Sequence, residues 1–236
     1  MVRPRHASTV VLVRPDEQGG FEILLTRRPE QMRFLGGFYV FPGGTVHASD
    51  HAPQALERCR GLSGDEAQRI LGGGHSVEVA LGHWVAVVRE LFEEVGVLLC
   101  DTESGGPVRL KDEETRKRIE QKRQAIVNSQ LDIGGFLESE NLLCDLSRTT
   151  YFDHWVTPEV YPMRFDTRFY LAAMPAHQRA LRRSEEVTDA VWMTPEEALT
   201  RNHRRDFPLI PPTTTVLQGL LRFSSWERLR AEFGLR

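Results

Sequence analysis

Residues 77–95 carry the strongest helical pattern in the chain. Their apolar side chains recur at the spacing of a single buried stripe, which consists of Leu81, Val85, Val88, Phe92 and Val95. Gly96 follows at the position where a helix C-cap glycine stands. The pattern predicts one long amphipathic helix whose apolar face is buried, and this helix constrains how the remaining segments can be arranged.

Three glutamates lie together near the end of this predicted helix. Residues three and four apart share a helix face, so Glu90 neighbours both Glu93 and Glu94. Their charges repel at neutral pH, and a divalent cation would offset that repulsion. Mg²⁺ or Mn²⁺ suits such a site, because hard cations take oxygen ligands and often bridge substrate phosphates. Arg89 lies four residues before Glu93 and is placed to orient it.

Most adjacent glutamates in proteins are solvated surface residues, and this chain has three other such pairs, at 113/114, 185/186 and 196/197. The segment 89–97 differs because its whole pattern, Arg-Glu-apolar-x-Glu-Glu-x-Gly-apolar, follows an amphipathic helix and a glycine turn at residues 42–44. We therefore predict a catalytic metal site only in the segment 89–97.

The remaining segments predict a mixed α/β fold. Strands are expected at residues 7–13, 21–27, 39–41, 149–157, 164–174 and 187–193. The first two are predicted to form a hairpin, as are the fourth and fifth, while Pro42-Gly43-Gly44 is expected to end regular structure. Further helices are expected at residues 53–60, 63–71, 111–130, 213–222 and 225–233. Together these elements indicate one domain over residues 1–236, with a mixed sheet sandwiched by helices.

Composition narrows the class of protein. Apolar residues make up 40% of the chain and charged residues 27%, as in globular proteins, and the net charge of -3 argues against a general nucleic-acid binder. No apolar run reaches the length of a membrane span, and residues 1–6 lack the apolar core of a signal peptide. Cytoplasm is therefore the expected location. Cys59, Cys100 and Cys144 are far apart in sequence, so we expect reduced structural thiols.

The glycine turn and the acidic helix together resemble the Nudix box, Gly-x5-Glu-x7-Arg-Glu-U-x-Glu-Glu-x-Gly-U, in which U is bulky and apolar. The second half matches from Arg89 to Val97, and Gly44 matches the first glycine. Asp50 stands where the first glutamate is expected, and residues 51–88 replace the usual seven-residue spacer. We interpret residues 51–81 as a helical insertion, because a longer loop costs little extra closure entropy.

The resemblance implies a Nudix-type α/β/α sandwich and a metal-dependent diphosphatase in which a water attacks phosphorus. By motif position, Glu93 and Glu94 are metal ligands, and Glu90 is a ligand or the base. The Gly44 backbone would approach the metal or the phosphates, together with Gly43. Family members often use one more acid from a later loop, and Asp50, Glu185 and Glu186 are the candidates. Histidines are not needed for a hard metal, so His75 in the insertion is expected at the surface.

Residues 24–44 add a resemblance to the coenzyme A diphosphatase signature Leu-Leu-Thr-x-Arg-Ser-x3-Arg-x3-Gly-x3-Phe-Pro-Gly-Gly. Every fixed position matches except Pro29, which replaces serine. Three arginines in or next to the signature, Arg27, Arg28 and Arg33, are predicted to contact the phosphates of the substrate. The chain also resembles peroxisomal acyl-coenzyme A diphosphatases in two features. The Nudix box is divided by a long insertion, and a segment like residues 157–169 follows it.

The leading hypothesis is hydrolysis of coenzyme A or acyl-coenzyme A to 3′,5′-adenosine bisphosphate and (acyl-)4′-phosphopantetheine. One alternative is a Nudix hydrolase of ADP-ribose or other nucleoside diphosphate derivatives. The other is a non-catalytic Nudix-like ligand sensor, for which the complete set of three glutamates is unnecessary. The sequence leaves open whether the insertion covers the site or forms a homodimer contact, and what the C-terminal helical extension, residues 200–236, contributes.

Overall fold

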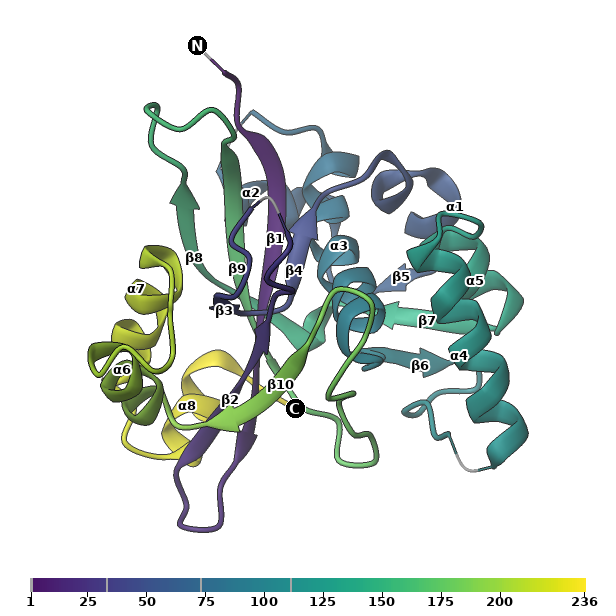
Figure 1. Cartoon of the computed structure of the whole chain (residues 1–236). Helices are drawn as coiled ribbons and strands as arrows, with labels where there is room; N and C mark the ends of the chain where they lie inside the picture. The colour runs from purple at the N-terminus through teal and green to yellow at the C-terminus, as the bar shows by residue number, and fades with distance from the viewer. Residues whose placement is uncertain (1, 33, 73, 111) are drawn as a thin grey trace.

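A seven-stranded mixed sheet lies at the centre of the computed structural model, which describes residues 2–32, 34–72, 74–110 and 112–236 (Figure 1). Its strands are β1 (Arg5–Pro15), β2 (Phe21–Arg27), β3 (Tyr39–Val40), β4 (Gly43–Thr45), β8 (Thr149–Val156), β9 (Phe165–Ala173) and β10 (Asp189–Met193). The main order is β10-β2-β1-β9-β8, with β3 beside β2 and β4 beside β1. β1 and β9 pair in parallel, and the other pairs are antiparallel.

β1 is buried on both faces, because alternate side chains of a strand point to opposite sides of the sheet. Val10 and Leu12 contribute to one apolar cluster, and Val11 and Val13 contribute to the other. All four side chains are fully buried. A strand that is buried on both faces has a continuous run of apolar residues, as the segment Val10–Val13 does. Such a strand requires helices on both faces of the sheet.

Helices provide this cover on each side (Figure 1). The first face is covered by α3 (Val77–Val95), with α1 (Pro53–Leu56), α2 (Gly64–Leu71), α4 (Glu113–Val127) and α5 (Ile133–Ser139) around it. The second face is covered by α6 (Pro195–His203), α7 (Pro211–Leu220) and α8 (Trp226–Phe233). Single 3₁₀ turns, η1 (Ala48–His51) and η2 (Leu146–Arg148), connect neighbouring elements. The predicted α/β sandwich is thus confirmed.

α3 matches its sequence prediction at both ends. The side chain of Ser76 accepts a hydrogen bond from the Val79 amide at the N-cap, and Gly96 adopts the left-handed conformation, with φ of 70°, at the C-cap. Both hairpins also form as expected. The highly charged helix is shorter than predicted, residues 113–127, and the first position of that prediction, residue 111, lies outside the described residues.

Other expectations were wrong. Residues 43–45 form β4, paired with β1, although Pro42-Gly43-Gly44 was expected to end regular structure. A second, three-stranded sheet of β5 (Cys59–Arg60), β7 (Leu142–Asp145) and β6 (Cys100–Thr102) was not predicted, and neither was α5. Its strands are too short to show an alternating pattern. It aligns Cys59 and Cys100 with Cys144, and all three thiols are free.

Every helix in the described part of the chain is too short or too polar to span a bilayer.

The C-terminal helices belong to the core, and this can be tested with two leucines of the α7 region. Leu217 is fully buried under the sheet, whereas Leu221, just after α7, is 51% exposed. We expect Leu217→Ala to lower the free energy of unfolding by about 2–5 kcal/mol, through lost burial and an internal cavity. Leu221→Ala should change it by no more than about 0.5 kcal/mol. Urea unfolding followed by circular dichroism measures both, and equal effects would contradict this packing.

Candidate active site

The glycine turn and the acidic end of α3 are in direct contact. β4 lies over α3, and the Gly43 amide donates a hydrogen bond to Glu94 Oε1 at 3.3 Å. A Cβ atom added to Gly44 would lie 2.4 Å from Glu90 Oε1, closer than packing allows. Gly44 therefore has to lack a side chain for the Glu90 carboxylate to occupy its place. The structure thus brings Gly43, Gly44, Glu90 and Glu94 together, although 46 positions separate Gly44 from Glu90.

Arg89 is the centre of a buried hydrogen-bond network. Its guanidinium donates to both carboxylate oxygens of Asp50, at 2.7 and 2.9 Å, and to the Thr45 carbonyl at 2.8 Å. It also donates to Glu90 Oε1 at 2.7 Å and Glu93 Oε2 at 3.1 Å. These five bonds match the five N–H donors of an arginine. Arg89 thereby fixes two of the three box glutamates, and its side chain is only 2% exposed.

Asp50 has a positioning role in the structure. Its side chain is fully buried, and Oδ2 also accepts a hydrogen bond from the His47 amide at 2.8 Å. Both carboxylate oxygens therefore face Arg89 and the η1 backbone. The sequence offered Asp50 as an additional acid of the site, but the geometry gives it the task of pairing with Arg89. The signal for this task was its position, with five residues between Gly44 and Asp50.

Burial sets the charge state of the box glutamates. Desolvation raises the pKa of Glu90 to about 7, although the charge of Arg89 opposes the rise. Burial also raises the pKa of Glu94 well above its ordinary value, with a further rise from the charge of Glu90. The pKa of Glu93 is raised for the same main reason, burial. Three carboxylates are thus held at one place where their negative charges are unfavourable.

This donor set fits a hard divalent cation. Carboxylate oxygens are the ligands such ions prefer, and the cation would offset the cost of burying the charged forms. Glu90, Glu93 and Glu94 are the residues able to hold it. Arg89 cannot neutralise all three, because both oxygens of Asp50 share its charge.

The two later acids differ in their surroundings. Glu185 pairs with Arg123 at 3.5 Å and accepts a hydrogen bond from Gln124 at 2.7 Å, so its carboxylate is directed to α4. Glu186 lies near enough to the box for its negative charge to raise the pKa of both Glu93 and Glu94. Glu186 is also exposed to solvent. Of the two candidates, Glu186 is the one whose charge acts on these two box carboxylates.

The arginines at the end of β2 also separate. Arg28 lies close enough to Glu94 for its charge to lower the pKa of that carboxyl, and its Nε is buried without a hydrogen-bond partner among the described residues. Arg27 donates to the Gly37 carbonyl and to Glu30, away from the carboxylates. Arg33, the third predicted arginine, lies outside the described residues. Of the two arginines that the structure describes here, Arg28 is therefore the one near the acidic face.

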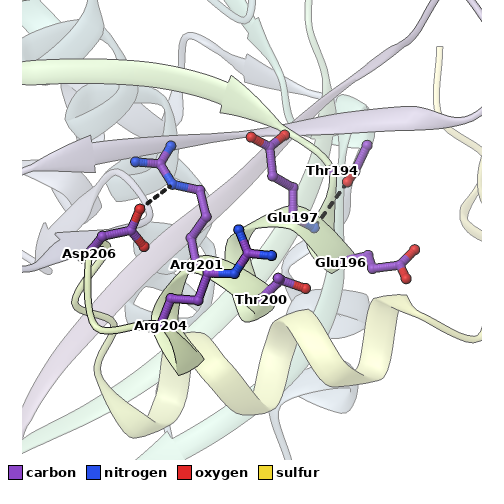
Figure 2. A pocket seen from close by; sticks show the side chains of 7 residues that line it. All are labelled: Thr194, Glu196, Glu197, Thr200, Arg201, Arg204 and Asp206. Atoms are coloured by element: carbon purple, nitrogen blue, oxygen red, sulfur yellow. Dashed lines mark hydrogen bonds and ion pairs between the residues drawn. The ribbon is translucent and has the colours of Figure 1, made fainter.

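A hollow of about 600 Å³ lies at α6, away from the acidic face (Figure 2). It is lined by Thr194, Glu196, Glu197, Thr200, Arg201, Arg204 and Asp206. Arg201 pairs with Asp206 across it, and the Thr194 hydroxyl caps the helix at Glu197 (Figure 2). Its charged groups include neither the box carboxylates nor Arg28, so this hollow is a separate surface feature.

The strand–loop–helix with its acidic face, set in a helix-covered mixed sheet, defines the Nudix fold. A crystal structure of a NUDIX hydrolase from Alicyclobacillus acidocaldarius is similar throughout, with a TM-score of 0.75 and 28% identity over 96% of this chain and 95% of that one. Residues 67–220 match the family described as the NUDT19 Nudix domain, and the chain belongs to that family. Nudix hydrolases generally use divalent metal ions.

Curated relatives carry the same family name. Acyl-coenzyme A diphosphatase NUDT19 of Gallus gallus is 28% identical over 244 residues, which cover 87% of this chain and 62% of that protein. The Xenopus laevis protein of the same name is 23% identical over 244 residues, 89% of this chain and 63% of that protein. The chain thus spans less than two thirds of the length of these relatives.

The Asp50–Arg89 pair is expected to be essential for stability. Asp50→Asn removes the carboxylate that pairs with Arg89 through both oxygens, and breaking a buried ion pair typically costs about 3–5 kcal/mol of unfolding free energy. Glu113→Gln breaks the exposed pair between Glu113 and Arg116 and should leave stability unchanged. Chemical denaturation of both variants measures the difference. A small effect of Asp50→Asn would show that Arg89 does not depend on Asp50.

Stability without divalent metal is expected to fall as pH rises from about 5 to 8. The folded chain keeps the Glu90 proton up to a pKa of about 7, whereas the unfolded chain loses it near 4.5. Folding therefore binds a proton in this window, and deprotonation of Glu90 removes up to about 3 kcal/mol as pH rises through it. Glu90→Gln should flatten this dependence.

Thermal unfolding in EDTA at several pH values measures the effect, with the exposed Glu227→Gln as control. A wild-type stability that is independent of pH, or that rises between pH 5 and 8, would contradict the assignment to Glu90. A pH dependence that Glu90→Gln leaves unchanged would contradict it as well.

Proposed function

We propose that this chain is a metal-dependent diphosphatase that hydrolyses coenzyme A or acyl-coenzyme A. The observation that carries the catalytic proposal is the buried contact of Glu90 and Glu94 with the glycine turn, next to Glu93. Burying several groups of the same charge is unfavourable by itself. Proteins contain such groups mainly where they bind a ligand or take part in a reaction. The proposed ion is Mg²⁺ or Mn²⁺.

Each residue has a role in the proposed reaction. Glu93 and Glu94 hold the cation, and Glu90 is a further ligand or the base that takes the proton of the attacking water. A pKa of about 7 for Glu90 suits a general base at neutral pH. When bound, the cation supplies charge stabilisation for the phosphates and lowers the pKa of water. Arg89 keeps Glu90 and Glu93 in place, and Glu186 is the proposed additional acid.

The overall reaction is a hydrolysis. Water oxygen forms a bond to one phosphorus of the diphosphate, the bridging P–O bond breaks, and two phosphate monoesters leave. With coenzyme A these are 3′,5′-adenosine bisphosphate and 4′-phosphopantetheine. Arg28 is proposed to contact the diphosphate, because it lies beside Glu94, and Gly43 and Gly44 let the substrate approach the backbone.

Two findings support coenzyme A as the substrate class. Residues 24–44 resemble the coenzyme A diphosphatase signature, and one of its basic positions, Arg28, follows β2 directly after Arg27. The curated relatives are named acyl-coenzyme A diphosphatases. Hydrolysis of ADP-ribose or another nucleoside diphosphate derivative is the second candidate, because the carboxylates and Arg28 recognise any diphosphate. A ligand sensor would not require three clustered carboxylates, two of them buried.

The first assay compares substrates. Purified protein with Mg²⁺ or Mn²⁺ is incubated separately with coenzyme A, an acyl-coenzyme A, ADP-ribose and diadenosine polyphosphates, and the products are identified by mass spectrometry. We expect 3′,5′-adenosine bisphosphate from both coenzyme A substrates. Glu94→Gln should lower kcat at least about 100-fold, because loss of a ligand removes several kcal/mol of transition-state stabilisation.

Glu185→Gln is the matched control, since Glu185 is a carboxylate that faces α4. It should stay within about twofold of wild type, the range of a surface change. Cleavage of ADP-ribose alone would overturn the coenzyme A assignment and keep the chemistry. Absence of any metal-dependent cleavage would favour a sensor.

Arg27, the last residue of β2, and Arg28, which follows it, are expected to act on different phosphates. Arg28→Gln should lower kcat/KM for coenzyme A and dephospho-coenzyme A alike, by about tenfold or more, because a charge-assisted contact to the shared diphosphate is lost. Arg27→Gln should reduce mainly the preference for coenzyme A, whose 3′-phosphate dephospho-coenzyme A lacks. Steady-state kinetics of wild type and both variants with each substrate, six enzyme–substrate pairs, decide this. An unchanged preference in Arg27→Gln would exclude Arg27 as the 3′-phosphate ligand.

A further inference from the structure

Three histidines from separate parts of the chain meet beside the sheet. His6 belongs to β1, His83 lies in the second turn of α3, and His75 immediately precedes the N-cap of α3. Each offers a ring nitrogen, and these nitrogens lie within 4.8 Å of one another. This was not predicted: His75 is half-buried and packs against both other rings, whereas the sequence suggested a surface residue.

The rings are arranged around a common point. Their centroids are separated by 4.8, 5.5 and 5.5 Å, and every pair of ring planes meets at about 70°. A tetrahedral zinc ion with Zn–N distances of about 2.0–2.1 Å places the centroids of its imidazole ligands roughly 5 Å apart. The observed spacing therefore needs little rearrangement to bind such an ion.

Two nitrogens of the cluster are buried without a partner. Nε2 of the fully buried His83 and Nδ1 of His6 have no hydrogen bond within the described residues. A buried polar atom without a partner is unfavourable and rare in folded proteins, so its presence indicates a missing ligand. Two such atoms in a single cluster of imidazoles point to the same ligand.

The other nitrogen of His83 is already oriented. Ser8 Oγ lies 3.0 Å from His83 Nδ1. Metal-binding histidines commonly use one ring nitrogen for an oxygen partner of this kind, which fixes the ring and leaves the other nitrogen for the metal. Burial lowers the pKa of all three histidines, that of His83 to about 3, so the rings are neutral at pH 7, the form that binds metals.

The surrounding charges permit a cation. The positive charge of Arg168 in β9 acts on all three rings, and that of Arg3 acts on His6. The Arg168 guanidinium donates to Asp166, which also accepts from His154 at 2.6 Å. Arg168 and Asp166 thus contribute opposite charges, and the three imidazoles contribute none. Three histidines leave one tetrahedral position, which water takes in zinc sites with three protein ligands.

We propose that His6, His75 and His83 form a binding site for a transition-metal ion of the zinc type, separate from the box carboxylates. Imidazole ligands select Zn²⁺ and similar ions, whereas Mg²⁺ prefers oxygen. His83 lies two helical turns before Glu90, about 10 Å along α3. An ion at this site joins β1, the end of the insertion and α3. The inference is independent of the proposed diphosphatase activity.

Zinc titration of residues 1–236 tests the site, in a Glu93→Gln/Glu94→Gln background that removes two of the three box carboxylates and with any histidine tag cleaved. After dialysis against a chelator, we expect one equivalent of Zn²⁺ to bind in competition with a chromogenic indicator. His75→Ala should lower the affinity at least about 100-fold, since loss of an outer partner alone costs 10–100-fold. The exposed His177→Ala serves as control.

Two further measurements separate ligation from folding. Ser8→Ala should weaken Zn²⁺ binding about 10–100-fold through loss of the His83 partner. Excess Zn²⁺ should raise the thermal midpoint of the background protein and of His177→Ala but not of His75→Ala, while Mg²⁺ should have no such effect. Absence of stoichiometric Zn²⁺ binding, or equal binding by His75→Ala and the control, would overturn the proposal.

Discussion

The buried guanidinium of Arg89 is the interaction on which the site depends. Its five hydrogen bonds connect three elements: β4 through the Thr45 carbonyl, η1 through Asp50, and α3 through Glu90 and Glu93. β4 is also held by its pairing with β1 and by the Gly43–Glu94 hydrogen bond. Arg89 adds one side chain that fixes the glycine turn, η1 and the acidic face to one another.

The same network explains why aspartate is sufficient at position 50. The η1 turn carries the backbone of Asp50 to Arg89, and the His47 amide fixes the carboxylate from behind. A short side chain then reaches the guanidinium with both oxygens. The motif requires a carboxylate in contact with Arg89. The geometry of the η1 turn determines how long the side chain that carries this carboxylate has to be.

Sequence patterns predicted those parts of the structure that depend on local signals. The extent of α3 was predicted because a repeating apolar stripe marks its buried face and Gly96 marks its end. The second sheet was missed, since its strands have two to four residues and are specified by pairing between distant segments. Helical spacing places the three glutamates together, and the whole pattern of residues 89–97 distinguished them from the other Glu-Glu pairs.

Contacts between distant elements could not be predicted in the same way. The different directions of Glu185 and Glu186 depend on α4, which supplies the partners of only one of them. The cluster of His6, His75 and His83 has no spacing signal at all, because three elements contribute one ring each.

The Asp50–Arg89 pair also accounts for the tolerance of a long insertion inside the box. Residues 51–76 leave the site directly after Asp50 and return at the N-cap of α3. Lengthening a loop costs little entropy when its ends are already fixed, and here the ion pair and the packing of α3 on the sheet fix them. The inserted α2 packs against α3, and α1 packs against α5, so the added residues bury their own apolar surface. The insertion therefore extends the first face of the sandwich while Arg89 preserves the acidic face of α3.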